Sequence, residues 1–403
     1  MSEWKKVKLK DCCHSISDGD HLPPPKSNSG VPFVTIANID ATNHIDFGNT
    51  MFVPLEYYNN LNDIRKAKCN DILYSVVGSF GKPVLIKENI PFAFQRHIAI
   101  LRPNNEIADS RFLYYVMLSR DFYMQADTVA IGAAQRTISL TALRNMEVEL
   151  PSMEIQHRIA NILSRYDSLI ENYQKQIKLL EEAAQRLYKE WFVDLRFPGH
   201  KNTKIVDGLP EGWEKKKVKE VCDTTSGGTP SRSKTEFYTG DILWVKTKEL
   251  NDDFIFDTEE KITEDAIRNS SAKMVPSGSI LMAMYGATIG KLGIATKELS
   301  CNQACCVFLL PEDSTLRLYL YNWLLNSRTL LISMGKGAAQ PNLSQDMIKN
   351  LEVVVPSSCL LAKFDSKVKP LYRIMSYHSS QIRLLTEARD RLLPKLMSGD
   401  IEI

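Results

Sequence analysis

The stretch Glu154–Phe192 reads EIQHRIANILSRYDSLIENYQKQIKLLEEAAQRLYKEWF, and its apolar and aromatic residues recur at alternating steps of four and three. This seam consists of Ile159, Leu163, Tyr166, Ile170, Tyr173, Ile177, Leu180, Ala184, Leu187 and Trp191. A heptad repeat of this length predicts one long helix, roughly 55–60 Å from end to end, whose apolar stripe packs against another helix. The other segments of the chain lie before and after this helical rod.

The sequence carries an internal repeat at an offset of 205–209 residues. The run WKKVKLKDCC from Trp4 returns as WEKKKVKEVC from Trp213. The rod is part of the repeat, because QIKLLEEA from Gln176 returns as QIRLLTEA from Gln381. The offset drifts by only four residues across a whole half, which indicates a duplication with small insertions in loops.

The second copy of the seam is less regular than the first. It consists of Phe364, Val368, Leu371, Met375, His378, Ile382, Leu385, Arg389, Leu392 and Leu396. Two of these positions, His378 and Arg389, are polar, and Pro370 lies inside the pattern. Because proline lacks the amide proton that a helix interior needs, we expect Pro370 to kink the helix or to restart it. The natural partner of this second helix is the first one.

The segments follow one another in the order globular unit, helix, globular unit, helix. We place the first globular domain at residues 1–152, the central helix at 153–195, the second globular domain at 196–357 and the C-terminal helix at 358–403. Two such halves can be related by a pseudo-twofold axis. The predicted fold class is α+β, with two pseudo-twofold-related globular domains separated by two long antiparallel coiled-coil helices.

Each globular domain is predicted to combine short strands with one helical stretch. Runs rich in β-branched and aromatic residues, bounded by turn residues, predict strands. These runs are Pro32–Ile39, Asp71–Val77, Val84–Ile86, His97–Leu101, Ile242–Val245, Ser279–Met284 and Ala304–Leu310. Aromatic and leucine residues at helical spacing predict a helix over Ser110–Asp127 in the first domain and over Leu316–Met334 in the second.

The composition is that of a globular protein with two or three domains: 403 residues, 44% apolar and 24% charged. No apolar run approaches the roughly 20 residues of a membrane span, and the N-terminus lacks the apolar core of a signal peptide, so we expect a cytoplasmic protein without membrane contact. A net charge of +2 confines any nucleic-acid surface to a local patch. Cys301, Cys305 and Cys306 lack the second ligand pair of a zinc site, which favours buried, reduced thiols.

Motifs of autonomous catalysis are missing from the sequence. The segment from Gly286 to Leu292 approaches a phosphate-binding loop, but it is one residue short between its glycines and has Leu where Ser or Thr must meet magnesium. We find neither the Asn/Asp-Pro-Pro-aromatic motif of a DNA methyltransferase nor the His-Glu-x-x-His and Gly-x-Ser-x-Gly motifs of hydrolases. The chain is therefore predicted not to be an enzyme on its own and to bind no cofactor or metal.

Four sets of polar loops occur once in each half, and we take them as candidate DNA contacts. In the first set, Ser17–His21 corresponds to the turn Ser226–Lys234, whose amides, hydroxyls and cations suit phosphate groups. The candidates in this turn are Ser226, Gly228, Thr229, Ser231 and Arg232. The third set suits base edges, because amides can bond adenine and arginine can bond guanine in a bidentate manner. Its candidates are Gln95, Arg96, Asn302 and Gln303.

The second and fourth sets are the Gly-Lys turn and the Gly-x-x-Gln loop of each half. The candidates in the second set are Ser79, Lys82, Tyr285, Thr288 and Lys291. The candidates in the fourth set are Gln135, Arg136, Thr137, Gln340 and Asn342. All four sets recur at matched positions while their contents differ, so we interpret the two halves as readers of two different targets.

Several modest motifs follow one another in a fixed order over the whole chain. They are the runs from Trp4 and Gly212, the turn SGGTPS at Ser226, the Gly-x-x-Gln loops, the Pro-led helix start at 151–158 and the run RDRLLPKLMSGD from Arg389. In this order they resemble the specificity subunit of type I restriction-modification systems.

The resemblance implies two target-recognition domains, each reading one half of a bipartite double-stranded DNA sequence, and a helix pair that spaces them. It also implies two modification subunits, which use S-adenosylmethionine to methylate adenine, and restriction subunits, which use ATP and Mg2+ to cleave DNA. The chain itself would be a non-catalytic recognition subunit. The alternative is a coiled-coil scaffold whose two globular heads bind protein or carbohydrate ligands.

Overall fold

A computed structural model of the chain describes residues 4–21, 23–40, 42–133, 135–311, 313–335 and 342–401. The chain divides into two compact units: residues 1–169 together with 385–403 form the first, and residues 170–384 form the second. Each long helix contributes one part to each unit. Within the described ranges, no helix is both long enough and apolar enough to cross a membrane.

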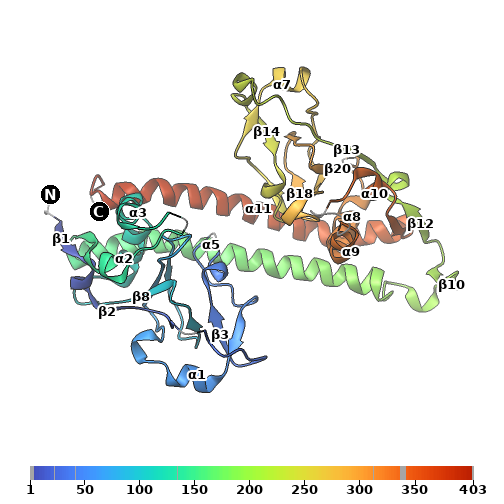
Figure 1. Cartoon of the computed structure of the whole chain (residues 1–403). Coiled ribbons are helices and arrows are strands. Elements are labelled where there is room, and N and C mark those ends of the chain that lie inside the picture. Colours follow the sequence, from blue (N-terminus) through green and yellow to red (C-terminus); the bar gives the residue numbers. More distant parts are fainter. Residues whose placement is uncertain are drawn as a thin grey trace. The chain divides into compact units, whose positions relative to one another are not determined.

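Three small sheets build the first unit (Figure 1). Its strands are β1 (Lys5–Lys8), β2 (Cys13–Asp18), β3 (Val31–Val34), β4 (Met51–Val53), β5 (Ile72–Ser75), β6 (Pro83–Leu85), β7 (Ala93–Phe94), β8 (Ile98–Pro103) and β9 (Glu147–Leu150). A central antiparallel sheet has the order β2-β8-β5-β6, and a smaller sheet has the order β4-β3-β7, in which β3 and β7 are parallel. The first strand of the unit pairs with its last, β1 with β9.

The second unit repeats this plan. Its strands are β10 (Ile205–Val206), β11 (Leu209–Pro210), β12 (Glu214–Lys217), β13 (Asp223–Ser226), β14 (Ile242–Val245), β15 (Asp253–Ile255), β16 (Lys261–Ile262), β17 (Ile280–Ala283), β18 (Leu292–Ala295), β19 (Ser300–Cys301), β20 (Cys305–Leu309) and β21 (Glu352–Val355). The central sheet has the order β13-β20-β17-β18-β15, the smaller sheet is β16-β14-β19, and β12 pairs with β21. The duplication in sequence is thus a duplication of sheet topology, with β15 added at one edge and the antiparallel pair β10–β11 added before β12.

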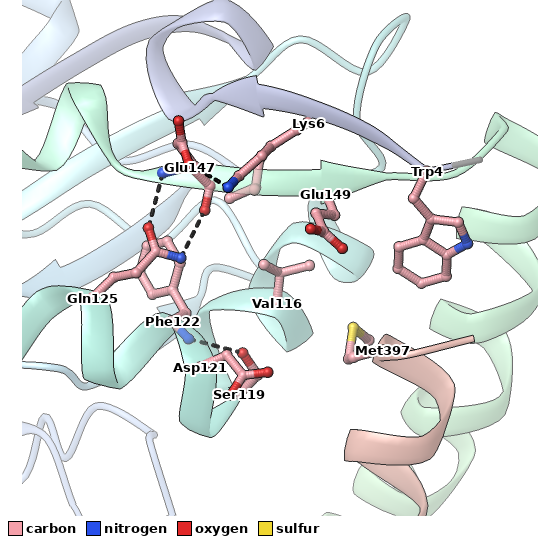
Figure 2. A pocket seen from close by; sticks show the side chains of 11 residues that line it. Trp4, Lys6, Val116, Ser119, Asp121, Phe122, Gln125, Glu147, Glu149 and Met397 are labelled. Carbon is pink, nitrogen blue, oxygen red and sulfur yellow. Dashed lines mark hydrogen bonds and ion pairs between the residues drawn. The ribbon is translucent and has the colours of Figure 1, made fainter. Parts of the chain in front are cut away.

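Each β-rich run predicted from the sequence contains or overlaps a strand, but several strands were missed, among them β2, β13, β18 and the closing pair β1–β9. The two strands of the closing pair are mostly charged, so they show no run of β-branched residues. They are held by opposite charges across the ladder, where Lys6 Nζ lies 2.7 Å from Glu147 Oε2 (Figure 2). The backbone of Glu147 is also bonded to the side-chain amide of Gln125, which accepts from its N–H at 3.0 Å and donates to its carbonyl at 3.1 Å.

The two predicted helical stretches are each broken into two helices, which corrects the expectation of one helix per domain. The first stretch forms α2 (Ser110–Leu118) and α3 (Arg120–Val129), and the second forms α8 (Leu316–Asn326) and α9 (Arg328–Met334). Ser119 explains the first break, because it is extended and its hydroxyl accepts from the amide of Phe122 as the N-cap of α3. The shorter helices are α1 (Leu55–Asn60), α4 (Leu140–Asn145), α6 (Val218–Val221), α7 (Glu264–Arg268) and α10 (Gln345–Lys349).

The predicted rod is α5 (Met153–Tyr188), which continues as a short π-helix over Lys189–Val193. All ten seam positions are buried or half-buried, which confirms the heptad prediction. Within the second unit, Tyr173 stacks on His378 with ring centroids 4.6 Å apart, and further along α5 Tyr188 meets Phe364 at 6.3 Å. Because later residues of α5 meet earlier residues of the partner helix, the pair is antiparallel.

The partner helix α11 (Ser358–Met397) continues through Pro370, so the prediction that the helix restarts there is wrong. Pro370 and Ser366, one turn earlier, both lie on the exposed face, where water can replace the backbone hydrogen bond that proline removes. The buried face is uninterrupted, with Val368 before the proline and Tyr372 after it.

The two polar positions of the second seam have specific partners inside their own units. His378 is 8% exposed and stacks on Tyr173. Arg389 donates from Nη1 to Asp167 Oδ1 at 2.7 Å, and the other oxygen of Asp167 accepts the hydroxyl of Tyr115 on α2 at 2.5 Å. At Arg389, what appears in the sequence as a flaw is therefore a polar tie between the helix pair and the first globular domain. The ring nitrogens of His378 are buried without a hydrogen-bond partner among the described residues.

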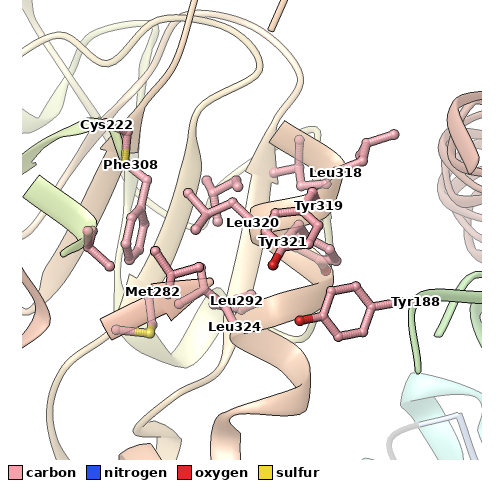
Figure 3. Close-up of a cluster of buried hydrophobic side chains, with 14 of the residues drawn as sticks. Tyr188, Cys222, Met282, Leu292, Phe308, Leu318, Tyr319, Leu320, Tyr321 and Leu324 are labelled. Carbon is pink, nitrogen blue, oxygen red and sulfur yellow. The ribbon is translucent and has the colours of Figure 1, made fainter. Parts of the chain in front are cut away.

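The long helices also form part of the hydrophobic cores. In the second unit, Tyr188 of α5 packs on Tyr319 of α8 at 5.6 Å between ring centroids, and this layer continues to Met282 and Phe308 of the central sheet (Figure 3). In the first unit, Leu163 of α5 belongs to the core that contains the central sheet and α2. The sheets are therefore anchored directly on the helices.

Candidate nucleic-acid interface

The central sheet of the first unit brings the polar loops to one of its ends. Asp18, the last residue of β2, pairs with Ala99 of β8, and Ser75, the last residue of β5, pairs with Ile98, the first of β8. The loops of the first, second and third sets leave from these strand ends. We call this end of the sheet, where β2 and β5 end and β8 and β6 begin, the polar edge.

The second unit has the same polar edge. Ser226, the last residue of β13, pairs with Cys306 of β20, and Ala283, the last residue of β17, pairs with Cys305, the first of β20. Topology therefore places the same three sets together in both units, although they are far apart in sequence.

Isolated β-bridges bring the fourth set to the same place. Val77 is bridged to Thr137 in the first unit, and Tyr285 is bridged to Asn342 in the second. The second and fourth sets are thus neighbours in each unit. Gln340 lies outside the described residues, so of the second unit's candidates in this set only Asn342 is placed.

The first and third sets of the second unit are joined by hydrogen bonds. The hydroxyl of Thr229 donates to Oε1 of Gln303, and the amide of Gly228 donates to the carbonyl of Cys301 at 2.9 Å. A Cβ at Gly227 would lie 2.0 Å from that carbonyl, so only glycine fits. Asn302 follows directly, and its side chain accepts from the amide of Ala304 at 3.2 Å.

Two aromatic side chains donate hydrogen bonds to backbone carbonyls of the turn Ser226–Lys234. The indole of Trp244 donates to the carbonyl of Gly228 at 3.0 Å, and the hydroxyl of Tyr238 donates to the carbonyl of Pro230 at 2.6 Å. The guanidinium of Arg232 lies 4.3 Å from the ring centroid of Tyr238, and its Nη1 is 2.7 Å from Glu260 Oε2. Arg232 thus links the turn to Tyr238 and Glu260, although its side chain stays 54% exposed, and the hydroxyls of Ser231 and Ser233 are exposed 2.8 Å apart.

The first unit keeps the backbone of this turn but changes its side chains. A Cβ at Gly19 would lie 2.1 Å from the carbonyl of Phe94, the same close approach as at Gly227. Asp20 accepts the hydroxyl of Tyr57 at 2.6 Å and lies 3.6 Å from the guanidinium of Arg65. The acidic turn of the first unit is therefore folded like its counterpart, but its carboxylates are mostly buried and paired inside the unit, with side-chain exposures of 13% for Asp18 and 15% for Asp20.

Gln95 and Arg96 lie at the tip beside this acidic turn. The amide of Gln95 donates to Val34 and the amide of Arg96 to Asp20, both at 3.1 Å, so the backbone is fixed while the Arg96 side chain is exposed. Burial and the neighbouring Arg96 charge lower the pKa of His97. The Arg96 guanidinium is thus an exposed cation beside this turn, whereas Arg65 is paired with Asp18 and Asp20.

The second and fourth sets of the first unit form an aromatic and guanidinium stack. The Ser75 hydroxyl braces the turn by accepting from Lys82 N at 2.9 Å and donating to Ser79 O at 3.0 Å. Phe80 at the turn stacks on Tyr123 with centroids 5.9 Å apart and an interplanar angle of 13°, and Arg136 lies 5.3 Å over Phe80.

Arg136 also forms an ion pair with Asp127, whereas the neighbouring Gln135 is exposed. Reasoning from sequence missed Phe80, Tyr123 and the aromatic pair under the other turn, because their roles depend on contacts between segments far apart in sequence. Trp244 occupies the strand position that Phe33 fills in the first unit.

In the second unit, ion pairs hold the corresponding turn in place. Lys291 Nζ lies 2.8 Å from Asp252 Oδ2, and Arg328 donates to the same carboxylate oxygen at 3.1 Å. Lys291 thus holds its turn onto the sheet. Tyr285 is 38% exposed, and its carbonyl accepts the Thr288 hydroxyl at 3.4 Å, which leaves the phenol ring as the feature displayed here.

The cysteine cluster behaves as a set of core thiols. Cys301, Cys305 and Cys306 are free and buried, and burial raises the pKa of Cys306 to about 12. Among the described residues, no group of three or more His, Cys, Asp or Glu side chains is arranged to hold a metal ion.

Comparison with known proteins matches both halves of the chain to one family. The family model of the type I restriction modification DNA specificity domain matches residues 1–182 and 210–359. The chain is 28% identical over 305 residues to the type I restriction enzyme MjaIX specificity subunit of Methanocaldococcus jannaschii, which covers 73% of this chain and 69% of that one. It is 24% identical over 475 residues to the type I restriction enzyme HindI specificity subunit of Haemophilus influenzae, which covers 100% of both.

A solved structure shares the fold over nearly the whole length. The S subunit of a type I restriction-modification system from M. genitalium is similar with a TM-score of 0.62 at 18% identity, covering 98% of this chain and 96% of that chain. The alternative of a scaffold for protein or carbohydrate ligands finds no support in these relatives, and they are recognition components, not catalytic enzymes. With a DNA specificity domain in each half, the chain belongs to the family of type I restriction-modification specificity subunits.

Proposed function

We propose that each unit of this specificity subunit reads one half of a bipartite double-stranded DNA target with its polar edge. The observation that carries the proposal is the repeated geometry of that edge: the same four loop sets meet at the same sheet end in both units, with different side chains. Two domains that recognise different DNA half-sites need the same backbone arrangement and different side chains in their loops.

The side chains at the two polar edges fall into three groups: those that suit bases, those that suit phosphates and those that support the turns. Gln303 and Asn302 in the second unit, and Gln95 and Arg96 in the first, offer the amide and guanidinium groups that pair with base edges in the major groove. Backbone amides and hydroxyls of the Ser226–Lys234 turn suit phosphate oxygens, which fix position without reading sequence. Arg232 and Lys291 act as braces of their turns, since each already pairs with a carboxylate.

The long helices would space the two readers and offer their outer faces to other subunits. We propose that two modification subunits dock there and that restriction subunits join the same complex. S-adenosylmethionine, ATP and Mg2+ would then be bound by those subunits, not by this chain. The support is the family membership together with the charged, exposed outer positions of α5, such as Arg165 and Lys178.

The experiment that tests this function is methylome sequencing of the host with and without the gene. We expect one methylated bipartite motif to disappear with the gene and to return with a wild-type copy. A copy that carries Gln303→Ala and Gln95→Ala together, and that still assembles with the modification subunit, should fail to restore the original motif. An unchanged methylome after deletion would refute the proposal.

A further inference from the structure

A pocket lies in the second unit at the end of the central sheet opposite its polar edge. It has a volume of about 540 Å³, which is within the range of small-molecule sites. Its walls include Gly278, just before β17 begins, and Thr296, just after β18 ends. Its other side is α11, from Asp365 to Ser376. The polar edge lies where β17 ends and β18 begins, so the pocket is not part of the candidate DNA surface.

Arg317 is held in this pocket, and one of its donors is buried without a partner among the described residues. Its guanidinium lies directly over Gly278, where a Cβ would come within 2.8 Å of Cζ and 2.9 Å of Nη1. Nη2 donates to the carbonyl of Pro311 at 2.9 Å. The Nε atom is buried and has no hydrogen-bond partner among the residues that the structure describes. A buried N–H without a partner is costly, so the site favours an incoming acceptor.

Two further cations reach the pocket from α11. Asp365, Lys369 and Arg373 follow one another at steps of four residues and therefore share one face of the helix. Burial raises the pKa of Asp365, while Lys369, Arg317 and Arg373, the three cations nearest to it, act in the opposite direction. Three cations around one carboxylate leave the pocket with an excess of positive charge.

The floor of the pocket is apolar and partly aromatic. It is formed by Phe254 of β15, Ile294 of β18, Leu318 of α8 and Tyr372 of α11. Tyr372 is fixed because its hydroxyl accepts from Asn322 Nδ2 at 3.0 Å. Cations at the rim over an aromatic floor suit a ligand that carries both an anionic group and a flat apolar group.

The internal repeat shows which residues occupy the same places in the first unit. Tyr115 reaches Asp167 from α2, and Asn322 reaches Tyr372 from α8. Asp167 and Tyr372 are equivalent at the offset of 205 residues that relates the long helices, so α2 and α8 align at an offset of 207.

By this alignment the charged residues of the pocket are replaced in the first unit by small ones. The counterparts of Arg317, Asp365, Lys369 and Arg373 are Ser110, Ala160, Ser164 and Ser168. The fold of a unit therefore does not need these charges, and the second unit carries them for another reason.

We propose that the pocket lined by Arg317, Lys369 and Arg373 binds a phosphorylated small molecule with an aromatic ring, of the chemical class of the nucleotides. The phosphate would accept from the guanidinium groups of Arg317 and Arg373 and from the Lys369 ammonium. The ring would lie on the floor beside Phe254. This inference goes beyond the proposed reading of DNA and does not depend on it.

Isothermal titration of the full-length protein with ATP, without divalent metal, tests the inference. We expect saturable binding of one ATP per chain, weaker binding of inorganic pyrophosphate, which lacks a ring, and none of adenosine, which lacks phosphate. Arg317→Gln and Arg373→Gln should each weaken ATP binding about tenfold or more, because each removes a charge-assisted contact to phosphate. Arg391→Gln is the matched control, since Arg391 lies on the same helix and its side chain is 79% exposed.

Three results would overturn the inference: no saturable binding of ATP, an equal loss in Arg391→Gln, or unchanged affinity in Arg317→Gln and Arg373→Gln. If ATP does not bind but Arg373→Gln releases the modification subunit, the pocket holds an acidic segment of that subunit and the nucleotide assignment is wrong. The assay is separate from DNA recognition, because a chain that binds ATP but has no DNA preference would refute only the proposed function.

Discussion

Single side chains at the polar edge differ in how far they are committed to contacts inside the protein. Gln303 accepts one hydrogen bond from Thr229 and keeps its amide nitrogen available at the surface. Lys291 is paired with Asp252. Both remain predicted DNA contacts, and we propose a reading role for Gln303 and a bracing role for Lys291.

Gln303→Ala should relax recognition at one base position of one half-site, because an amide that pairs with a base edge contributes about 1–3 kcal/mol of discrimination. Competition binding of the assembled complex to oligonucleotides with each base at each position measures this. Gln135→Ala is the control in the other unit and should leave that half-site unaffected. A uniform loss over all oligonucleotides would assign Gln303 to positioning.

Glu181 of α5 makes the stability of the second unit depend on pH. Burial, with the nearby carboxylates of Asp253 and Asp252, raises the pKa of Glu181 to about 7. A raised carboxyl pKa means that the folded state favours the protonated form, so this contribution to stability is complete below the unfolded value near 4.5 and is lost as pH rises through about 7. Glu181→Gln should therefore raise the melting temperature at pH 8 and change it little at pH 5.

Differential scanning fluorimetry between pH 5 and pH 8 tests this effect. Glu298→Gln serves as the control, because it makes the same substitution at an exposed position of the same unit. If the melting temperatures of Glu181→Gln and wild type stay parallel over this range, Glu181 is not the titrating group.

At the scale of elements, the two long helices pack through an apolar seam and also share a mostly buried ion pair, Asp167 with Arg389. The side chains of Asp167 and Arg389 are 13% and 23% exposed, and Asp167 also accepts from Tyr115. Sequence reasoning took Arg389 as a defect because it sits at a seam position, although its charge is matched across the helix pair.

Arg389→Ala should destabilise the first unit by about 3–5 kcal/mol, because it leaves the Asp167 carboxylate mostly buried without its cation. Chemical denaturation measures the loss as a decrease in the free energy of unfolding of the first unit. Arg391→Ala is the matched control: its ion pair with Glu387 lies on the surface and is worth about 0.5 kcal/mol or less. Equal effects of the two substitutions would show that the tie adds nothing beyond a surface pair.

The sequence predicted these elements unevenly, for physical reasons. The heptad seam and the central strands were predictable because burial imposes a period on apolar residues. The continuity of α11 through Pro370 was not, because it depends on which side of the helix faces water. The break at Ser119 was missed because a capping hydroxyl is a local contact inside an otherwise helical pattern.

At the scale of the whole molecule, the candidate interface could be predicted only as residue types in loops. The repeat showed which loops correspond, and the order β2-β8-β5-β6 explains why they meet. The supporting aromatic residues, such as Trp244 and Phe80, were not predictable, because the role of each depends on a contact with a segment distant in sequence.

If the helix pair sets the spacing of the two half-sites, lengthening it should lengthen the DNA spacer. One heptad inserted between Lys178 and Arg186 of α5, together with one between Val368 and Met375 of α11, adds roughly 10 Å, or about three base-pair rises. Methylome sequencing should then reveal the same half-sites with a spacer longer by about three base pairs. A heptad in α5 alone is the control and should disrupt assembly, because it shifts the seam of one helix against the other. An unchanged spacer in the doubly extended protein would exclude the ruler.

Each unit is closed by a two-stranded ladder, β1 with β9 and β12 with β21. These ladders determine where one globular domain could be replaced by another during evolution. The chain enters and leaves each globular domain through adjacent strands, so a domain can be exchanged at these two crossings while the long helices stay intact. Recombination between related genes at the segments that encode the ladders would transplant one complete reader. Inheritance of a new half-site would then require no coordinated mutation in the other half of the chain.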